Sequence, residues 1–203
     1  MSESGSVKFT HEQIASAPVA FRGMAELNAC RRRLLQLRLL GVDTVGIGFG
    51  NLSVRDSEPA CFHITGSMTG ALAELGPEHF ARVTAYDFSR NWLRSEGVAV
   101  ASSESLTHAA IYEADASVSG IIHAHSATLW QRWRGVAPTT SPTVEYGTPA
   151  MAGEVMRLFA TTDVMEKKLF VMGGHEEGIV AFGGDLEEAF AVLVRSYDGY
   201  LRR

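Results

Sequence analysis

The feature that most constrains this chain is an apolar run, residues 118–125, which ends in two histidines one residue apart. Side chains at positions i and i+2 of a β-strand lie on the same face, so His123 and His125 can converge on one ion. Imidazole is a common ligand for zinc and other transition metals. The alternative is two histidines that are hydrogen-bonded separately. The run predicts a strand, and a metal site if other segments supply further ligands.

Helical patterns and hairpin-like strand pairs interleave along the rest of the chain. Helices are expected from the capping box at residues 10–13, over residues 18–40, 103–114 and 148–160, and after Asp185. Strand pairs are expected at residues 51–55 with 61–65, 82–87 with 91–94, and 168–172 with 178–182. This pattern predicts an α/β fold with a largely antiparallel sheet. Residues 9–203 would form one domain, and the small, polar residues 1–8 are expected to be disordered.

Length and composition limit the classes of protein that are possible. A chain of 203 residues has room for one sizeable α/β domain. Its net charge of −5 disfavours nucleic acid or an anionic membrane as a partner. No run approaches the roughly 18 apolar residues of a membrane span, and two cysteines without a CxxC pair favour a reducing cytoplasm. The basic cluster at residues 31–38 alternates with leucines and indicates the solvated face of an amphipathic helix.

Two further segments have residue types suited to a ligand site. Residues 41–51 contain four glycines, which let backbone N–H groups approach a ligand closely. Ser102, Ser103 and Glu104 stand at an expected helix start, which attracts anions. Glu104 has two interpretations: a carboxylate that complements the helix dipole, or a general base beside a metal and a substrate.

Taken together, GFGNLSVR, FHITGS, ASSESLTHAAIY, GIIHAHS and GIVAFGGDLEEAF resemble the class II aldolase/adducin family, in that order along the chain. The specific part is S-S-E followed by H-x-H. The resemblance covers the chain from about residue 20 to its C-terminus. It implies a single three-layer α/β/α domain, a divalent metal bound by three histidines, and a homo-oligomer, commonly a tetramer.

The resemblance implies that two of the metal ligands are His123 and His125. The third histidine of the family precedes a glycine on a late strand, where this chain has Glu177 before Gly178, and its nearest histidine is His175. We expect His175 to fill the position, since Gly173 and Gly174 allow a local bulge. Glu177 is the alternative. The metal is expected to be Zn²⁺, with Mn²⁺, Fe²⁺ or Co²⁺ as other candidates.

The resemblance also implies roles for other residues. Glu104 matches the family's general base, and Tyr146 matches a tyrosine that reaches the active site of a neighbouring subunit and donates a proton. The substrate pocket maps onto Asn51, Thr65, Gly66, Ser102 and Ser103. The family's usual T-P-[ST]-G reads Thr65-Gly66-Ser67-Met68 here, which puts a phosphorylated substrate in question.

These roles imply a metal-dependent lyase. The simplest is an aldolase that cleaves a small hydroxy-carbonyl compound through a metal-stabilised enediolate. A decarboxylase, an epimerase or a dehydratase would use the same groups, and the adducin branch offers a non-catalytic interaction module as a further alternative.

Overall fold

A computed structural model describes residues 8–201 of the chain, with side chains for residues 8–195. Of the segment expected to be disordered, residues 1–7 lie outside this range. Lys8 lies within it and donates a hydrogen bond to the Glu145 carboxylate at 2.9 Å.

A large sheet forms the centre of the molecule. Its strands are β1 (Thr10–Ile14), β4 (Asn51–Arg55), β5 (Phe62–Thr65), β6 (Phe80–Asp87), β7 (Trp92–Glu96), β8 (Gly120–His125), β9 (Leu169–Val171) and β10 (Gly178–Gly183). Their order across the eight-stranded sheet is β1-β7-β6-β5-β4-β8-β10-β9. Every neighbouring pair is antiparallel except β1 with β7. A two-stranded hairpin, β2 (Gly41–Val42) with β3 (Gly48–Phe49), precedes β4.

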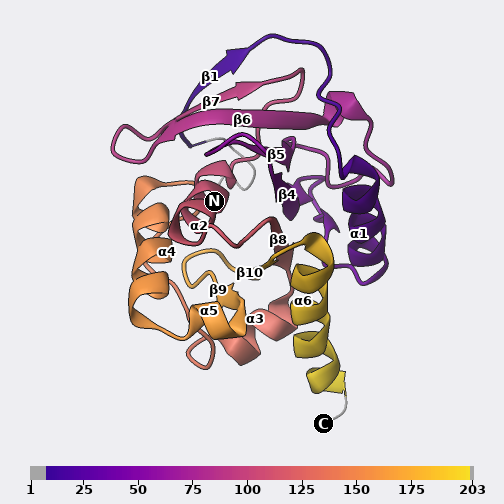
Figure 1. The fold of residues 1–203 in the computed structure, drawn as a ribbon. Helices are drawn as coiled ribbons and strands as arrows, with labels where there is room; N and C mark the ends of the chain where they lie inside the picture. Colours follow the sequence, from indigo (N-terminus) through magenta and orange to yellow (C-terminus); the bar gives the residue numbers. More distant parts are fainter. Residues whose placement is uncertain (1–7, 202–203) are drawn as a thin grey trace.

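Helices cover both faces of the sheet. They are α1 (Met24–Gln36), the short 3₁₀ helix η1 (Pro77–His79), α2 (Ser105–Ala114), α3 (Ala127–Trp133), α4 (Pro149–Thr161), α5 (Val164–Lys167) and α6 (Leu186–Leu201). Figure 1 shows α2 and α4 on one side of the sheet, with α1 and α6 on the other. None of the helices in the described part of the chain has the length and apolar character that a membrane crossing requires.

Each face of the sheet has its own hydrophobic core. Ile121 of β8 and Phe182 of β10 pack in the core under α2 and α4. Their strand neighbours Ile122 and Ala181 pack in the core under α1 and α6. This alternation is the period-2 pattern of a strand that is buried on both sides. The α/β/α fold with a central, mostly antiparallel sheet is therefore confirmed, as are the three predicted strand pairs.

Two predicted helices were wrong in whole or in part. The capping-box pattern at residues 10–13 predicted a helix, but these residues form β1, which pairs in parallel with β7 in a non-local contact that the local pattern does not encode. The helix predicted over residues 18–40 is only α1. Gly23 precedes it with a left-handed φ of 99°, which separates residues 18–22 from the helix.

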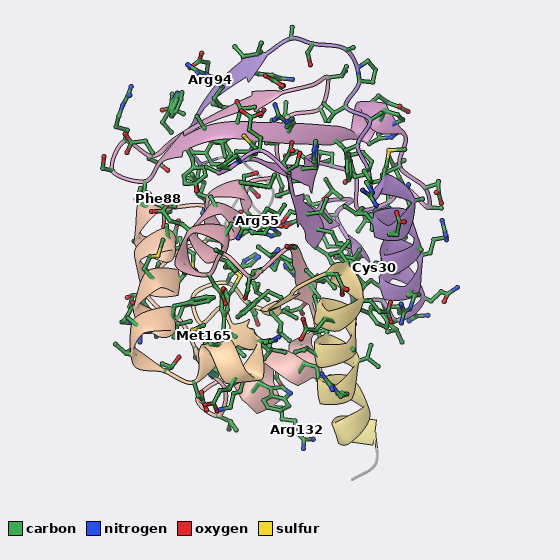
Figure 2. All side chains as sticks on the ribbon, viewed as in Figure 1. Cys30, Arg55, Phe88, Arg94, Arg132 and Met165 are labelled. Atoms are coloured by element: carbon green, nitrogen blue, oxygen red, sulfur yellow. The ribbon has the colours of Figure 1, made fainter. Side chains whose placement is uncertain are left out.

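The helix α2 is fixed to the sheet by an arginine at its carboxyl end. Arg55, at the end of β4, donates hydrogen bonds to the carbonyl oxygens of Tyr112, Asp115 and Val118 at 2.9, 2.9 and 2.6 Å. Arg55, labelled in Figure 2, is partly buried. A cation at a helix C-terminus also interacts favourably with the helix dipole. This contact orients the opposite end of α2, where the predicted base Glu104 stands.

Candidate active site

His123 and His125 lie on the face of β8 that α2 covers. Their neighbours Ile122 and Ala124 belong to the core of the opposite face, so the alternation of the strand turns both imidazoles toward α2. The ring centroids of the two histidines are 4.9 Å apart. The predicted convergence of the pair is thus present in the structure.

His175 reaches the same place from the turn between β9 and β10. The turn packs tightly: a Cβ at Gly173 would lie 2.2 Å from the carbonyl oxygen of Thr140, and a Cβ at Gly174 would lie 2.1 Å from that of Val144. His175 Nε2 lies 3.1 Å from His125 Nε2. One ligand atom from each of the three histidines lies within 4.8 Å of the other two.

Glu177, the alternative third ligand, does not join this group. Among the described residues, the three histidines form the one group of potential ligands that could hold a metal ion. Glu177 has a left-handed φ of 68° at the end of the turn, and its carbonyl oxygen accepts a hydrogen bond from the Ser126 backbone. The geometry therefore favours His175 over Glu177.

Burial keeps the three imidazoles neutral. It lowers the pKa of His125 to about 4. The pKa of His175 is lowered to about 3, first by burial and then by the charges of His125 and Lys8. The pKa of His123 is lowered well below its ordinary value, first by burial and then by the other two histidines. A neutral imidazole has the lone pair that a metal needs. His123 Nε2 is buried and has no hydrogen-bond partner in the described structure, so the donor set fits a divalent cation.

Glu104 directly precedes α2 and is buried, with 2% of its surface exposed. Its Oε2 accepts a hydrogen bond from Thr107 at 2.7 Å, whereas Oε1 has no partner in the described structure. Its side chain makes no capping hydrogen bond. Burial raises the pKa of Glu104 to about 7, against the opposing effects of the Thr107 hydrogen bond and of Lys8. A carboxyl group with such a pKa can accept and return a proton near neutral pH.

These groups line one pocket. Its walls contain the three histidines and Glu104, together with Asn51, Gly66, Ser102, Ser103 and Tyr146 from the sequence prediction. Thr65 does not line it: this residue is buried, and its hydroxyl accepts a hydrogen bond from the Leu52 backbone at 3.2 Å. The structure therefore separates Thr65 from the other predicted pocket residues.

Tyr146 lines the pocket of its own chain. Its ring centroid lies 4.3 Å from that of His175, and the amino group of Lys8 lies 4.0 Å from the centre of the tyrosine ring. The resemblance implied that this tyrosine reaches the site of a neighbouring subunit. The structure places it beside His175 of the same chain, and its reach into a neighbouring subunit stays a prediction.

Sequence reasoning missed several pocket residues. Phe49 stacks on His125 with ring centroids 5.3 Å apart, and Thr69 lines the pocket beside Met68. Lys8, which was assigned to a disordered segment, lines an adjoining pocket that shares Tyr146 and His175. The glycine-rich segment signalled the position of Phe49, but nothing in the local pattern of Lys8 signalled its contact with Tyr146.

Comparison with known proteins gives one family. The model of the class II aldolase and adducin N-terminal domain matches residues 26–196. No curated protein sequence matches the chain.

Several solved structures are similar. An L-fuculose 1-phosphate aldolase is 24% identical, with 90% of this chain and 85% of that chain covered and a TM-score of 0.64. YgbL from Klebsiella pneumoniae, described as a candidate aldolase, epimerase or decarboxylase, is 20% identical, with 85% and 83% covered and a TM-score of 0.62. A sugar-phosphate aldolase from Thermotoga maritima is 16% identical, with 88% and 93% covered and a TM-score of 0.63. At these identities the likeness establishes the fold.

Proposed function

We propose that this chain, which belongs to the class II aldolase and adducin family, is a metal-dependent lyase, most simply an aldolase acting on a small hydroxy-carbonyl compound. One observation carries the proposal. The three neutral histidines and the unpartnered carboxylate oxygen of Glu104 come from separate segments, yet all belong to the residues around one pocket. A purely structural domain has no need for such a group of buried, unpartnered polar atoms.

In this proposal His123, His125 and His175 hold a divalent cation, with Zn²⁺ as the first candidate and Mn²⁺, Fe²⁺ or Co²⁺ as others. When bound, the cation supplies positive charge that polarises the carbonyl group of the substrate. The three ligands are neutral, so they leave that charge undiminished.

Glu104 is the proton-transfer group. Its Oε1 is free to take a proton from a substrate carbon or oxygen, while Oε2 stays anchored to Thr107. Tyr146, on the His175 side of the pocket, exchanges a proton with the hydroxyl oxygen of the fragment that leaves. Glu104 exchanges one with the other fragment, so the two groups serve the two sides of the carbon–carbon bond that breaks.

The remaining wall binds the far end of the substrate. Asn51, Ser102 and Ser103 offer an amide and two hydroxyls, and Gly66 brings the backbone close to the pocket. Beside them Met68 is 66% exposed and adopts a left-handed φ of 63°. A thioether at this position favours a substrate with an apolar or carboxylate end over a phosphorylated one, and Thr65 is left out of the substrate contacts.

Product analysis tests the reaction. The metal-loaded protein is incubated with hydroxy-carbonyl compounds of three to six carbons, with and without a phosphate group, and Glu104→Gln is the matched control. An aldolase yields two carbonyl fragments in the wild type and none above background in the control. Carbon dioxide, water loss or an inverted stereocentre would replace the aldolase by a decarboxylase, a dehydratase or an epimerase. A protein that retains metal but turns over no compound would favour the adducin-like interaction module.

We also propose a homotetramer in the cytoplasm, with a small molecule as its substrate. The family resemblance supports the assembly, and the two buried, unpaired cysteines, Cys30 and Cys61, are consistent with a reducing compartment. Light scattering on the purified protein measures the assembly, and a monomer or a dimer would contradict it.

A further inference from the structure

Asn51 and His123 face each other across two strands. They are direct partners in the antiparallel pairing of β4 with β8, which places both side chains on the same face of the sheet. The amide nitrogen of Asn51 lies 3.1 Å from Nδ1 of His123. Oδ1 of Asn51 and Nε2 of His123 are both buried, and neither has a hydrogen-bond partner among the residues that the structure describes.

The positions of the hydrogens explain why neither atom has a hydrogen-bond partner. An amide nitrogen only donates, so His123 Nδ1 must accept. A neutral imidazole then has its hydrogen on Nε2, where no acceptor is available within the described structure. This is the wrong tautomer for a metal ligand, because a nitrogen that binds a cation through its lone pair has no hydrogen.

We infer that Asn51 is a positioning residue that selects the metal-binding tautomer of His123. Rotation of the Asn51 amide by about 180° exchanges its oxygen and nitrogen. The oxygen then accepts a hydrogen bond from Nδ1–H of His123, and Nε2 presents its lone pair to the space shared with His125 and His175. The rotation gives Asn51 Oδ1 a partner, the imidazole of His123. The proton shift from Nε2 to Nδ1 leaves Nε2 free to bind the cation. The inference rests on the proposed function, since it assumes that the histidines bind a metal.

The rotation has a consequence for the substrate side. Once Oδ1 faces His123, the amide nitrogen becomes the free atom, and Asn51 lines the pocket. It can then donate a hydrogen bond to a substrate oxygen. Before the rotation one of the two amide hydrogens is held by His123 Nδ1, and after it both can face the pocket, so metal loading strengthens the donor that Asn51 offers to a substrate.

Three variants isolate this role. Asn51→Asp keeps an acceptor oxygen toward His123, and Asn51→Leu removes every polar side-chain atom at similar volume. Ser103→Ala is the control, because Ser103 lines the pocket but makes no hydrogen bond to a histidine in the described structure. Zn²⁺ affinity is measured by competition with a chromogenic chelator. We expect Asn51→Leu to bind about 10- to 100-fold more weakly than the wild type, as when other groups that orient a metal-bound histidine are lost. Asn51→Asp should bind at least as tightly as the wild type, and Ser103→Ala within about twofold of it.

A second measurement needs no variant. The ¹⁵N shifts of the His123 ring in wild-type protein distinguish a protonated from an unprotonated Nδ1. The proposal expects the hydrogen on Nε2 without metal and on Nδ1 with Zn²⁺. Unchanged shifts on loading, or equal Zn²⁺ affinities for wild type and Asn51→Leu, would overturn the role of Asn51 while leaving the metal site intact. A wild type that binds no Zn²⁺ would overturn the proposed function and this inference with it.

Discussion

At the scale of single residues, Glu104 is a carboxyl group in an environment that differs sharply from water. Burial raises its pKa to about 7 from an ordinary value of 4.5. The folded protein therefore holds this proton in a pH range where the unfolded chain has lost it. As the pH rises from about 4.5 to about 7, the unfolded chain ionises at Glu104 while the folded chain stays protonated. The unfolded state is thereby stabilised, and the free energy of unfolding decreases.

Replacement of Glu104 by glutamine removes this titration and the base together. We compare the unfolding free energies of apo Glu104→Gln and of the apo wild type. From pH 5 to pH 8 the difference between them should shift by about 2–3 kcal/mol in favour of the variant, because the glutamine never ionises. Urea unfolding of both proteins at the two pH values measures the gain. A gap between the two proteins that is independent of pH would contradict the environment described for Glu104.

The same variant should retain its metal but lose turnover by about 10²- to 10⁴-fold, the usual contribution of a positioned acid or base. Bound metal and initial rates measured on one preparation separate the two effects. Near-normal rates would remove Glu104 from the chemistry.

At the scale of elements, the segment that leads into β4 depends on a close approach at Gly50. A Cβ there would lie 2.2 Å from the buried Leu40 side chain and 3.0 Å from the carbonyl oxygen of His123, at a φ of 76°. Gly46 has a similar φ of 85° with nothing within 4 Å. The two glycines therefore share the backbone cost of a side chain and differ in the space around it.

Alanine at each position tests that difference. Gly46→Ala should cost about 1 kcal/mol of unfolding free energy, and Gly50→Ala about 2–4 kcal/mol, because only the second also overpacks the core beside His123. Equal urea midpoints for the two variants would show that the close approach at Gly50 carries no cost.

A buried arginine of helix α1 binds the loop of residues 69–72, which contributes Thr69 to the pocket wall. Arg31 is 2% exposed and donates to the carbonyl oxygens of Thr69 and Leu72, both at 2.8 Å. The sequence pattern placed Arg31 on a solvated face together with Arg32. That was wrong for Arg31, because this residue lies about 100° around the helix from Arg32 and faces the loop of residues 69–72 that packs on α1.

Substitution of the two arginines should therefore lower the unfolding free energy by different amounts. Arg31→Met leaves two carbonyl oxygens without donors and should cost about 2–4 kcal/mol. Arg32→Met removes an exposed ion pair with Glu74 and should cost less than about 1 kcal/mol. Thermal unfolding of the pair checks the contrast, and similar losses in the two variants would deny Arg31 its role.

How far the sequence predicts this protein depends on whether the information is local. The strand pairs, α2 and the position of His123 with His125 follow from alternation and spacing that neighbouring residues encode. The strand β1, the buried side of Arg31 and the exclusion of Thr65 from the pocket depend on contacts across tens of residues, which no local pattern contains. The choice between His175 and Glu177 likewise required the turn geometry that the two packed glycines impose.

At the scale of the whole molecule, the buried histidines make the unfolding free energy decrease at low pH. The folded-state pKa values of His125 and His175, about 4 and about 3, lie below that of an unfolded histidine near 6.5. The unfolded chain therefore takes up protons first, and the stability that these residues provide above pH 6.5 is lost as the pH falls.

The unfolding free energy of the apo protein should decrease between pH 6.5 and pH 4.5, with a shallower slope in His125→Gln. Zn²⁺ should be released over the same range, because protons compete for the same nitrogens. Urea unfolding across this range measures the slopes. Slopes that match in the two proteins would contradict the burial described for His125.

The most direct test of the central claim is the number of divalent ions that each chain retains after reconstitution with Zn²⁺ and removal of free metal. The His123, His125 and His175 site predicts one ion in the wild type, close to none in His175→Ala, and one in Glu177→Ala. Well under one ion in the wild type, or loss of the ion in Glu177→Ala with retention in His175→Ala, would contradict it.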